Sequence, residues 1–282
     1  MTIDLKNNIL FNELTSKIDS LIPLPTTISE IMKVTQVPNF TAKDISKIIG
    51  KDQAMVSRIL KLANSSYYGY QKSINTISHA IVCLGMETVK NLALSASSVK
   101  FLKKPVRSYA LEGEALFQHS LAVALGSRII AKKIGYSNYE EVYIMGLLHD
   151  IGKLVIDQHA SQKFREVILL FYKGGITFLE AEETIMGFNH GTLGAEIAVN
   201  WNLGDELIDT IRYHHIPQKA KEDNFSVHII HVADILAEMI GLGIGVDGLN
   251  YEMDSNSLQK LKITDMDDII SNLADEIEQE ND

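Results

Sequence analysis

Histidine and aspartate residues recur in this sequence at positions where an amphipathic helix would present an apolar side chain. The chain has nine histidines in 282 residues, and several of them share this placement with two aspartates. A polar group buried without a partner costs roughly several kcal/mol, so these side chains are expected to bind one another or a ligand. The candidates are His119, His149, Asp150, His190, His214, His215 and Asp234.

Imidazole and carboxylate groups are ligands of borderline divalent metals, so a metal site needs no cysteine here. We expect one ion to take His119, His149, Asp150 and Asp234. A second ion would share Asp150 as a bridge and take His190, His214 and His215. Two such ions with two carboxylates leave net positive charge that suits a phosphate ester. A pair of ions about 3.5–4 Å apart lowers the pKa of a bridging water and binds the phosphoryl oxygens.

Two further residues extend this hypothesis. Lys153 follows His149 by one helical turn, so its ammonium is placed to reach a substrate phosphate, and we assign catalytic roles to Asp150 and Lys153. His231 lies one turn before Asp234 and is predicted to hold that carboxylate from outside the metal site. The alternative for each residue taken singly is structural: a hydrogen-bonded core histidine, a capping or ion-paired aspartate, or a lysine that extends to solvent. His228 is assigned to core packing.

The apolar residues recur at intervals of three to four along most of the chain, which predicts an all-α protein. Asp44 and Asn75 are the expected starts of two helices in the first half. In the second half, Ser137-Asn-Tyr-Glu140 predicts a capping box that opens the helix leading to His149. Asn189 is the expected N-cap before His190, and Pro217 ends the helix that carries His214 and His215.

Three parts of the chain are predicted: an N-terminal helical part over residues 1–106, a helical bundle with the candidate ligands over 107–243, and an acidic tail over 244–282. The tail is expected to form a helix that begins at Thr264, with Asp267 completing a capping box. Its apolar stripe is Met266, Ile270, Leu273 and Ile277. This helix either docks on the bundle or binds a partner, and docking is the favoured interpretation.

Composition narrows the class of protein. The formal net charge is −10, from 26 Lys+Arg and 36 Asp+Glu, and 46% of residues are hydrophobic. The acidic balance argues against non-specific nucleic-acid binding, and the hydrophobic content supports a packed core. We find no signal peptide or membrane-spanning run, and the single cysteine, Cys83, fits a reducing compartment. The expected location is the cytoplasm, without membrane association.

The order His119, His149-Asp150 and Asp234 resembles the metal-dependent phosphohydrolases of the HD superfamily. His190, the pair His214-His215 and the run His149-Asp-Ile-Gly-Lys153 resemble the longer ligand set of its HD-GYP subgroup, whose site is usually dinuclear, often with iron, and hydrolyses cyclic di-GMP. After His215 this chain reads Ile216-Pro-Gln-Lys219, without Gly-Tyr-Pro. Ala115 replaces the glutamate of three-metal members. The resemblance therefore implies two divalent ions, with iron favoured over manganese or zinc.

The first half resembles the HDOD domain, the HD-related output domain of bacterial signalling proteins, and this similarity spans about residues 15–240. It rests on Leu21-Ile-Pro-Leu-Pro25, Leu60-Lys-Leu-Ala-Asn-Ser65 with Tyr67-Tyr-Gly69, and Ile77-Ser-His-Ala-Ile81 leading to Leu84-Gly85. Many members of that family lack metal ligands and act as regulatory modules, whereas this chain keeps the ligands.

Three functions remain open from the sequence. The first is a signal-transduction protein with a dinuclear site that hydrolyses a nucleotide or cyclic nucleotide. The second is a non-catalytic output module that binds a signalling partner or ligand, with structural or sensory metals. The third is DNA binding through a helix-turn-helix over Asp44–Gly50 and Met55–Lys61, with Arg58 and Lys61 as contacts. The low content of basic residues disfavours the third.

Overall fold

The computed structural model describes residues 5–35, 39–64, 73–248 and 251–281, and all regular elements in these ranges are helices. The extended pairing found there is a single isolated bridge between Val106 and Leu111. This confirms the predicted all-α fold. Among the described helices, none has the length and apolarity required to cross a bilayer.

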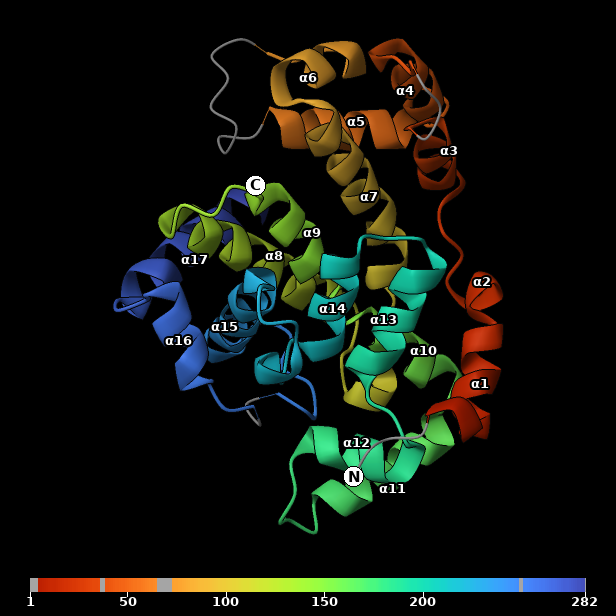
Figure 1. Cartoon of the computed structure of the whole chain (residues 1–282), viewed down its shortest axis with the longest axis vertical. Helices are drawn as coiled ribbons and strands as arrows, with labels where there is room; N and C mark the ends of the chain where they lie inside the picture. Colours follow the sequence, from red (N-terminus) through yellow and green to blue (C-terminus); the bar gives the residue numbers. More distant parts are fainter. Residues whose placement is uncertain (1–4, 36–38, 65–72, 249–250, 282) are drawn as a thin grey trace. The chain divides into compact units, whose positions relative to one another are not determined.

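The chain forms two compact units, which Figure 1 shows with their helices labelled. The first unit comprises Met1–Pro23 and Phe101–Asp282, and the second comprises Leu24–Lys100. The N-terminal segment thus belongs with the second half of the chain: the indole nitrogen of Trp201 donates to the carbonyl of Ile22 at 3.1 Å. The sequence-based boundaries after residues 106 and 243 remain a prediction of domain organisation.

The first unit contains all the candidate ligands. Its short early elements are the 3-10 helix η1 (Leu5–Asn7), α1 (Ile9–Ser16) and α2 (Ile18–Leu21). Its main helices are α8 (Ala115–Lys133), α9 (Tyr139–Leu148), α10 (Ile151–His159), α11 (Ser161–Phe171), α12 (Phe178–Met186), α13 (His190–Asn200), α14 (Asp205–Tyr213), α15 (Phe225–Met239), α16 (Ser255–Leu261) and α17 (Met266–Asn281). Two 3-10 turns, η3 (Arg107–Tyr109) and η4 (Pro217–Lys219), complete it.

Helix α8 is the centre of this unit and packs against α9, α15 and α17 (Figure 1). Small residues allow these close approaches. A Cβ placed on Gly126 of α8 would lie 3.5 Å from Cβ of Ala233 on α15 and 3.5 Å from a methyl of Leu273 on α17. Gly146 of α9 lies against the α8 backbone, where a Cβ would come within 2.8 Å of the Ala124 Cα. Helices α8, α9 and α15 therefore meet at the distance that brings their polar side chains together.

The tail forms helix α17, which docks on the bundle against α8, as the favoured interpretation of the tail expected. Its Ile269 and Leu273 side chains are buried, and Arg128 of α8 forms an ion pair with Glu276 at 2.9 Å. The predicted helix start was wrong by one residue. Asp265 accepts a hydrogen bond from the amide of Asp268, so Thr264 is not the cap.

The capping box predicted before His149 is also wrong. The N-cap of α9 is Asn138, without a side-chain cap bond, and Ser137 instead donates to the Asn138 side chain. Further along the chain, Asn189 caps α13 as predicted, because its side-chain oxygen accepts from the amide of Thr192 at 2.8 Å.

The second unit consists of α3 (Thr26–Thr35), α4 (Ala42–Ile49), α5 (Gln53–Ala63), α6 (Ile77–Leu84) and most of α7 (Met86–Leu102). Thr41 and Thr76 cap α4 and α6, so the starts predicted at Asp44 and Asn75 are corrected. Asp44 serves instead as the reciprocal partner of Thr41 in a capping box. The sequence proposed as a helix-turn-helix corresponds to α4 and α5. Arg58, one of its two expected DNA contacts, instead donates to the backbone carbonyl of Ala96 at 3.0 Å.

Candidate metal centre

All seven predicted ligands lie together in the first unit, three of them on helices and four in the segments just beyond helix ends. His119 is on α8, and His149 and Asp150 form the junction between α9 and α10. His190 is the first residue of α13, His214 and His215 follow the last residue of α14, and Asp234 is on α15. Their side chains are buried, with none more than 4% exposed. Three overlapping groups of these residues present donor atoms within 4.8 Å of one another.

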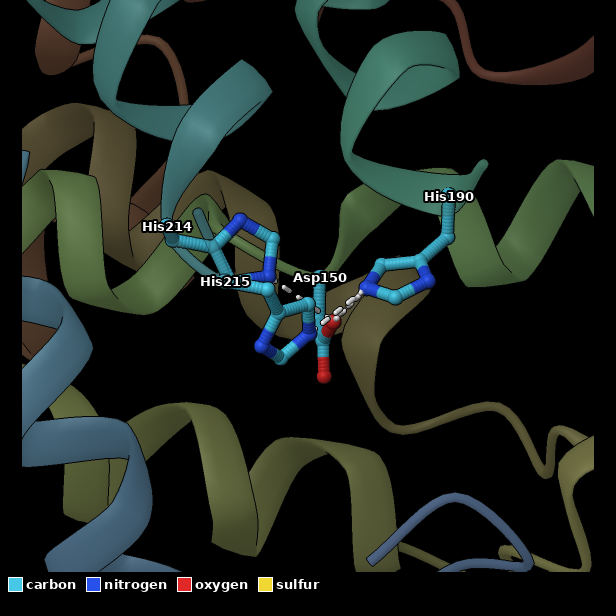
Figure 2. A group of neighbouring side chains, drawn as sticks. All are labelled: Asp150, His190, His214 and His215. Atoms are coloured by element: carbon cyan, nitrogen blue, oxygen red, sulfur yellow. Dashed lines mark hydrogen bonds and ion pairs between the residues drawn. The ribbon is translucent and has the colours of Figure 1, made fainter. Parts of the chain in front are cut away.

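Asp150 lies at the centre of the cluster, with imidazoles on both sides of its carboxylate. Its Oδ1 is 3.5 Å from Nε2 of His190 and 3.9 Å from Nε2 of His214. Its Oδ2 is 3.3 Å from Nε2 of His149 and 3.6 Å from Nε2 of His119. Figure 2 shows His190 approaching this carboxylate from the side opposite His214 and His215. A carboxylate with its two oxygens toward two sets of imidazoles has the arrangement expected of a bridging ligand.

Asp234 also faces both sets of imidazoles, which the sequence did not indicate. Its Oδ1 is 3.0 Å from Nε2 of His119 and 3.6 Å from Nε2 of His149. Its Oδ2 is 3.5 Å from Nδ1 of His215. The sequence predicts Asp234 as a ligand of one ion only. In the structure its two oxygens face both halves of the cluster.

Backbone carbonyls hold Nδ1 of three histidines, so Nε2 of each ring points toward the centre of the cluster. Nδ1 of His149 donates to the carbonyl of Gly146 and Nδ1 of His214 to that of Ile211, each at 2.7 Å. Nδ1 of His119 donates to the carbonyl of Leu242 at 3.1 Å. Because a carbonyl can only accept, Nδ1 of each ring carries a proton, and Nε2 of each ring faces the cluster.

Several of these buried atoms have no hydrogen bond from any residue that the structure describes: Nε2 of His149, Nε2 of His214, Nδ1 of His215, Oδ1 of Asp150 and Oδ2 of Asp234. Buried polar atoms normally have a hydrogen-bond partner, so a group of unpartnered atoms that face one point indicates a ligand site. The donor set of imidazole nitrogens and carboxylate oxygens fits divalent transition metals. His190 and His215 also lie close together, with their Nε2 atoms in hydrogen-bond contact at 3.0 Å.

The pKa values of the clustered side chains are shifted from their ordinary values by burial and by neighbouring charges. Burial alone would raise the pKa of the Asp150 carboxyl, but Lys153 and His149 hold it well below its ordinary value. Burial lowers the pKa of His214, and His149 and His190 lower it further, to about 3. For His119, the hydrogen bond and charge of Asp234 outweigh burial and raise the pKa to about 9. The carboxylates thus remain ionised and attract a cation, while His214 remains a neutral ligand.

Glu182 supports the cluster from outside, a role that the sequence did not reveal. Its Oε2 accepts from Nδ1 of His190 at 2.8 Å and from the amide of the same residue at 3.1 Å. Its Oε1 accepts from the hydroxyl of Tyr109 at 2.5 Å. All three side chains are buried. A carboxylate behind a histidine fixes the ring and makes its other nitrogen a better metal ligand.

Lys153 is held inside the cluster, which excludes the solvent-exposed alternative. Its ammonium lies 2.7 Å from Oδ2 of Asp150 and 2.6 Å from Oδ2 of Asp247. The side chain is 6% exposed, and the ammonium also faces the Tyr109 ring, 5.3 Å from its centroid. Asp247, the second partner, follows α15 in an irregular segment and carried no signal in the sequence.

The prediction that His231 holds the Asp234 carboxylate is wrong. Its Nδ1 donates to the backbone carbonyl of His214 at 2.8 Å, and its Nε2 accepts from the amide of Asp254 at 2.9 Å. On α15 the two residues are three positions apart, but these hydrogen bonds direct the His231 ring toward the end of α14. His231 therefore positions the His214 backbone.

Glycine in the run His149-Asp-Ile-Gly-Lys153 has a packing role. A Cβ on Gly152 would lie 2.0 Å from the carbonyl oxygen of His190 and 2.8 Å from the amide nitrogen of Gly194. Both atoms belong to the backbone of α13, so only a residue without a side chain permits this contact. The close packing of α10 on α13 brings His190 to the Asp150 carboxylate.

A family model describing the HDOD domain matches residues 21–217. The chain belongs to the HDOD domain family. The family resemblance predicted from the sequence is thereby confirmed. Of the residues that carry this resemblance, Ser65 and Tyr67–Gly69 lie outside the described residues.

This HDOD protein is similar in sequence to parts of longer proteins. It is 30% identical over 217 residues to an uncharacterized protein of Treponema pallidum, an alignment that covers 73% of this chain and 40% of that protein. It is 27% identical over 184 residues to Ribonuclease Y of Mycoplasmoides gallisepticum, covering 62% and 28% of the two chains. The HDOD chain thus matches less than half the length of either relative.

Solved structures share the fold across nearly the whole chain. An HDOD domain protein of Geobacter sulfurreducens superposes with a TM-score of 0.70 at 27% identity, covering 96% of this chain and 89% of that one. A Shewanella amazonensis protein whose name includes the words metal-dependent phosphohydrolase has a TM-score of 0.61 at 18% identity, covering 97% and 99%. At 18% identity, the similarity to the Shewanella amazonensis protein shows a shared fold.

Proposed function

We propose that this HDOD protein is a metal-dependent phosphohydrolase that cleaves a phosphate ester of a nucleotide or cyclic nucleotide. The observation that carries the proposal is the placement of Asp150, with imidazoles facing each of its carboxylate oxygens. This arrangement favours two divalent ions bridged by one aspartate, with iron as the expected metal and manganese or zinc as alternatives. When bound, the ions supply positive charge to phosphoryl oxygens and a water of lowered pKa.

The protein's own groups have distinct roles in this proposal. His119 and His149 would hold one ion with Asp234, and His190, His214 and His215 would hold the other, with Asp150 shared. Glu182 and the carbonyls of Gly146 and Ile211 keep the rings oriented. Lys153 adds a positive charge beside Asp150 that a substrate phosphate can use. The ligands are buried, so the site excludes bulk water, which strengthens each of these electrostatic contacts.

The test combines metal content with hydrolysis. Elemental analysis of the purified protein should find about two Fe, Mn or Zn per chain, and the double variant His149→Ala/Asp150→Ala should lose them. The loaded protein is then offered cyclic dinucleotides, nucleoside phosphates and a short RNA, the last because the relatives include Ribonuclease Y. Turnover of any of these that disappears in the double variant supports the proposal. Absence of metal after reconstitution contradicts it.

A second function is supported by the closure of the site. The side chains of the candidate ligands are at most 4% exposed, which suits a non-catalytic output module whose ions are structural or sensory and which binds a signalling protein. Stoichiometric metal without turnover of any substrate in the panel would favour this alternative. Turnover lost with the metal would rule it out.

A further inference from the structure

The described residues between α15 and α16 lie against the candidate metal centre. We call the described part of this segment, residues 241–248 and 251–254, the strap. Four of its residues contact the cluster or its supports. The carbonyl of Leu242 accepts from Nδ1 of His119, and the carboxylate of Asp247 pairs with Lys153 at 2.6 Å. The ring of Tyr251 stacks on His215, and the amide of Asp254 donates to His231.

The strap's glycines permit this close approach. Gly243 has a φ of 63°, and a Cβ there would lie 2.4 Å from Cβ of His119 and 2.7 Å from the Ala115 carbonyl oxygen. A Cβ on Gly245 would lie 2.7 Å from the carbonyl oxygen of Tyr109, to which the amide of Val246 donates at 2.8 Å. The strap backbone therefore lies directly on α8 and on the turn that carries Tyr109.

The two side-chain contacts cover the parts of the site that a substrate must reach. Asp247 places an anionic oxygen 2.6 Å from the Lys153 ammonium, which is where the proposed function requires a phosphate oxygen. Tyr251 covers one face of His215, with ring centroids 3.6 Å apart and planes inclined by 11°. A carboxylate on an ammonium has the same charge complementarity as a phosphate on that ammonium, so the two compete.

We propose that the strap is an autoinhibitory segment that closes the metal centre, with Asp247 occupying the phosphate position on Lys153 and Tyr251 covering His215. This inference rests on the proposed function, because it takes the cluster to be a phosphate-binding metal site. Phosphate binds only when the strap withdraws, so its apparent affinity is reduced by the fraction of molecules that are open. Four contacts share the closure, and loss of one side chain shifts the balance toward the open form.

The test titrates inorganic phosphate into the Mn²⁺-loaded full-length protein by calorimetry, after metal analysis of each sample. Asp247→Asn and Tyr251→Ala are compared with the wild type and with Glu252→Gln. Glu252 lies in the same segment with an exposed side chain, so its variant makes the same charge change as Asp247→Asn away from the cluster. If the strap is closed in about nine of ten molecules, both strap variants bind phosphate up to about tenfold more tightly, and Glu252→Gln resembles the wild type.

The outcomes separate this inference from the proposed function. Metal in the wild type with tighter phosphate binding in both strap variants supports the autoinhibitory strap. Metal with unchanged or weaker phosphate binding in the two variants overturns the strap and leaves the proposed function standing. A wild-type protein that holds no Mn²⁺ overturns the proposed function and the strap together. Because Asp247 and Tyr251 are tested separately, misfolding of one variant leaves the other to decide.

Discussion

Glu182 fixes the ring of His190 by accepting hydrogen bonds from both its Nδ1 and its backbone amide. The same carboxylate accepts from Tyr109 through its second oxygen. Glu182 thus joins the turn before α8, helix α12 and the first residue of α13. The pair is a carboxylate–histidine arrangement of the kind that supports metal ligands in many proteins.

The first prediction concerns this support. Glu182→Gln keeps the shape of the side chain but removes the charge that stabilises Nδ1–H of His190. We expect the affinity for the metal to fall about 10–100-fold, as for other outer-shell partners of histidine ligands. Competition with a chelating dye measures the Kd. Glu166→Gln, at an exposed position on α11, is the control, and equal Kd values in the two variants would show that Glu182 has no such role.

The second prediction separates the two halves of the cluster. His190→Gln should remove one ion and His119→Gln the other, because their Nε2 atoms face different oxygens of Asp150. Asp150→Asn should weaken both. Elemental analysis of the three variants, prepared side by side, provides the measurement. If His190→Gln and His119→Gln each lost all metal, the two halves would not bind independently.

The third prediction concerns the packing of α10 on α13. Gly152→Ala places a methyl group against the backbone of His190 and Gly194, so the helices must separate. We expect a loss of about 1–3 kcal/mol in the free energy of unfolding, as for other overpacked cores, together with weaker metal binding. Urea unfolding and metal analysis test both effects. In the control Gly204→Ala, the nearest non-local atom to the added methyl is 4.0 Å away, and a similar loss there would remove the explanation.

The fourth prediction concerns pH and His228. Nδ1 of His228 lies 2.7 Å from the Ser257 hydroxyl, and Nε2 accepts from the Lys260 ammonium at 3.1 Å. Burial and then the Lys260 charge lower the pKa of His228 from 6.5 to about 4. The unfolded chain therefore takes up this proton at a higher pH than the folded protein. His228 contributes stability that is present above pH 6.5 and is lost as the pH falls toward 4.

His228→Gln should therefore make the free energy of unfolding fall less steeply over that pH interval. Urea titrations of the metal-free protein at a series of pH values measure the slope. His159→Gln, at an exposed position at the end of α10, is the control. Parallel pH curves for the wild type and His228→Gln would contradict the assignment.

The candidate ligands were identifiable from the sequence because each breaks a regular apolar stripe. His119 and Asp234 lie at interior positions of long helices, where burial follows from helical periodicity alone. Asn189, a strong N-cap, placed His190 at the start of its helix. Helix starts were less well predicted: near Asn75 and Ser137, neighbouring residues offer equivalent caps, and the choice depends on contacts elsewhere in the fold.

The supports of the site could not be found in the same way. Glu182 lies on a helix with other acidic residues, and Asp247 and Tyr251 lie in an irregular segment, so no local pattern distinguishes them. Their roles arise from the return of distant segments to one place. The assignment of His231 failed for a related reason: proximity to Asp234 along α15 did not determine which way the ring points, and the carbonyl of His214 did.

His149 and His214 are both the C-cap of their helix, and each ring donates to the carbonyl three residues earlier. These carbonyls belong to the last turn, where a helix leaves its acceptors unsatisfied. The orientation of both rings is therefore encoded within four consecutive residues and does not need an ion. The entropy of ordering them is lost when the helices form, so an arriving metal meets donors that are already aimed.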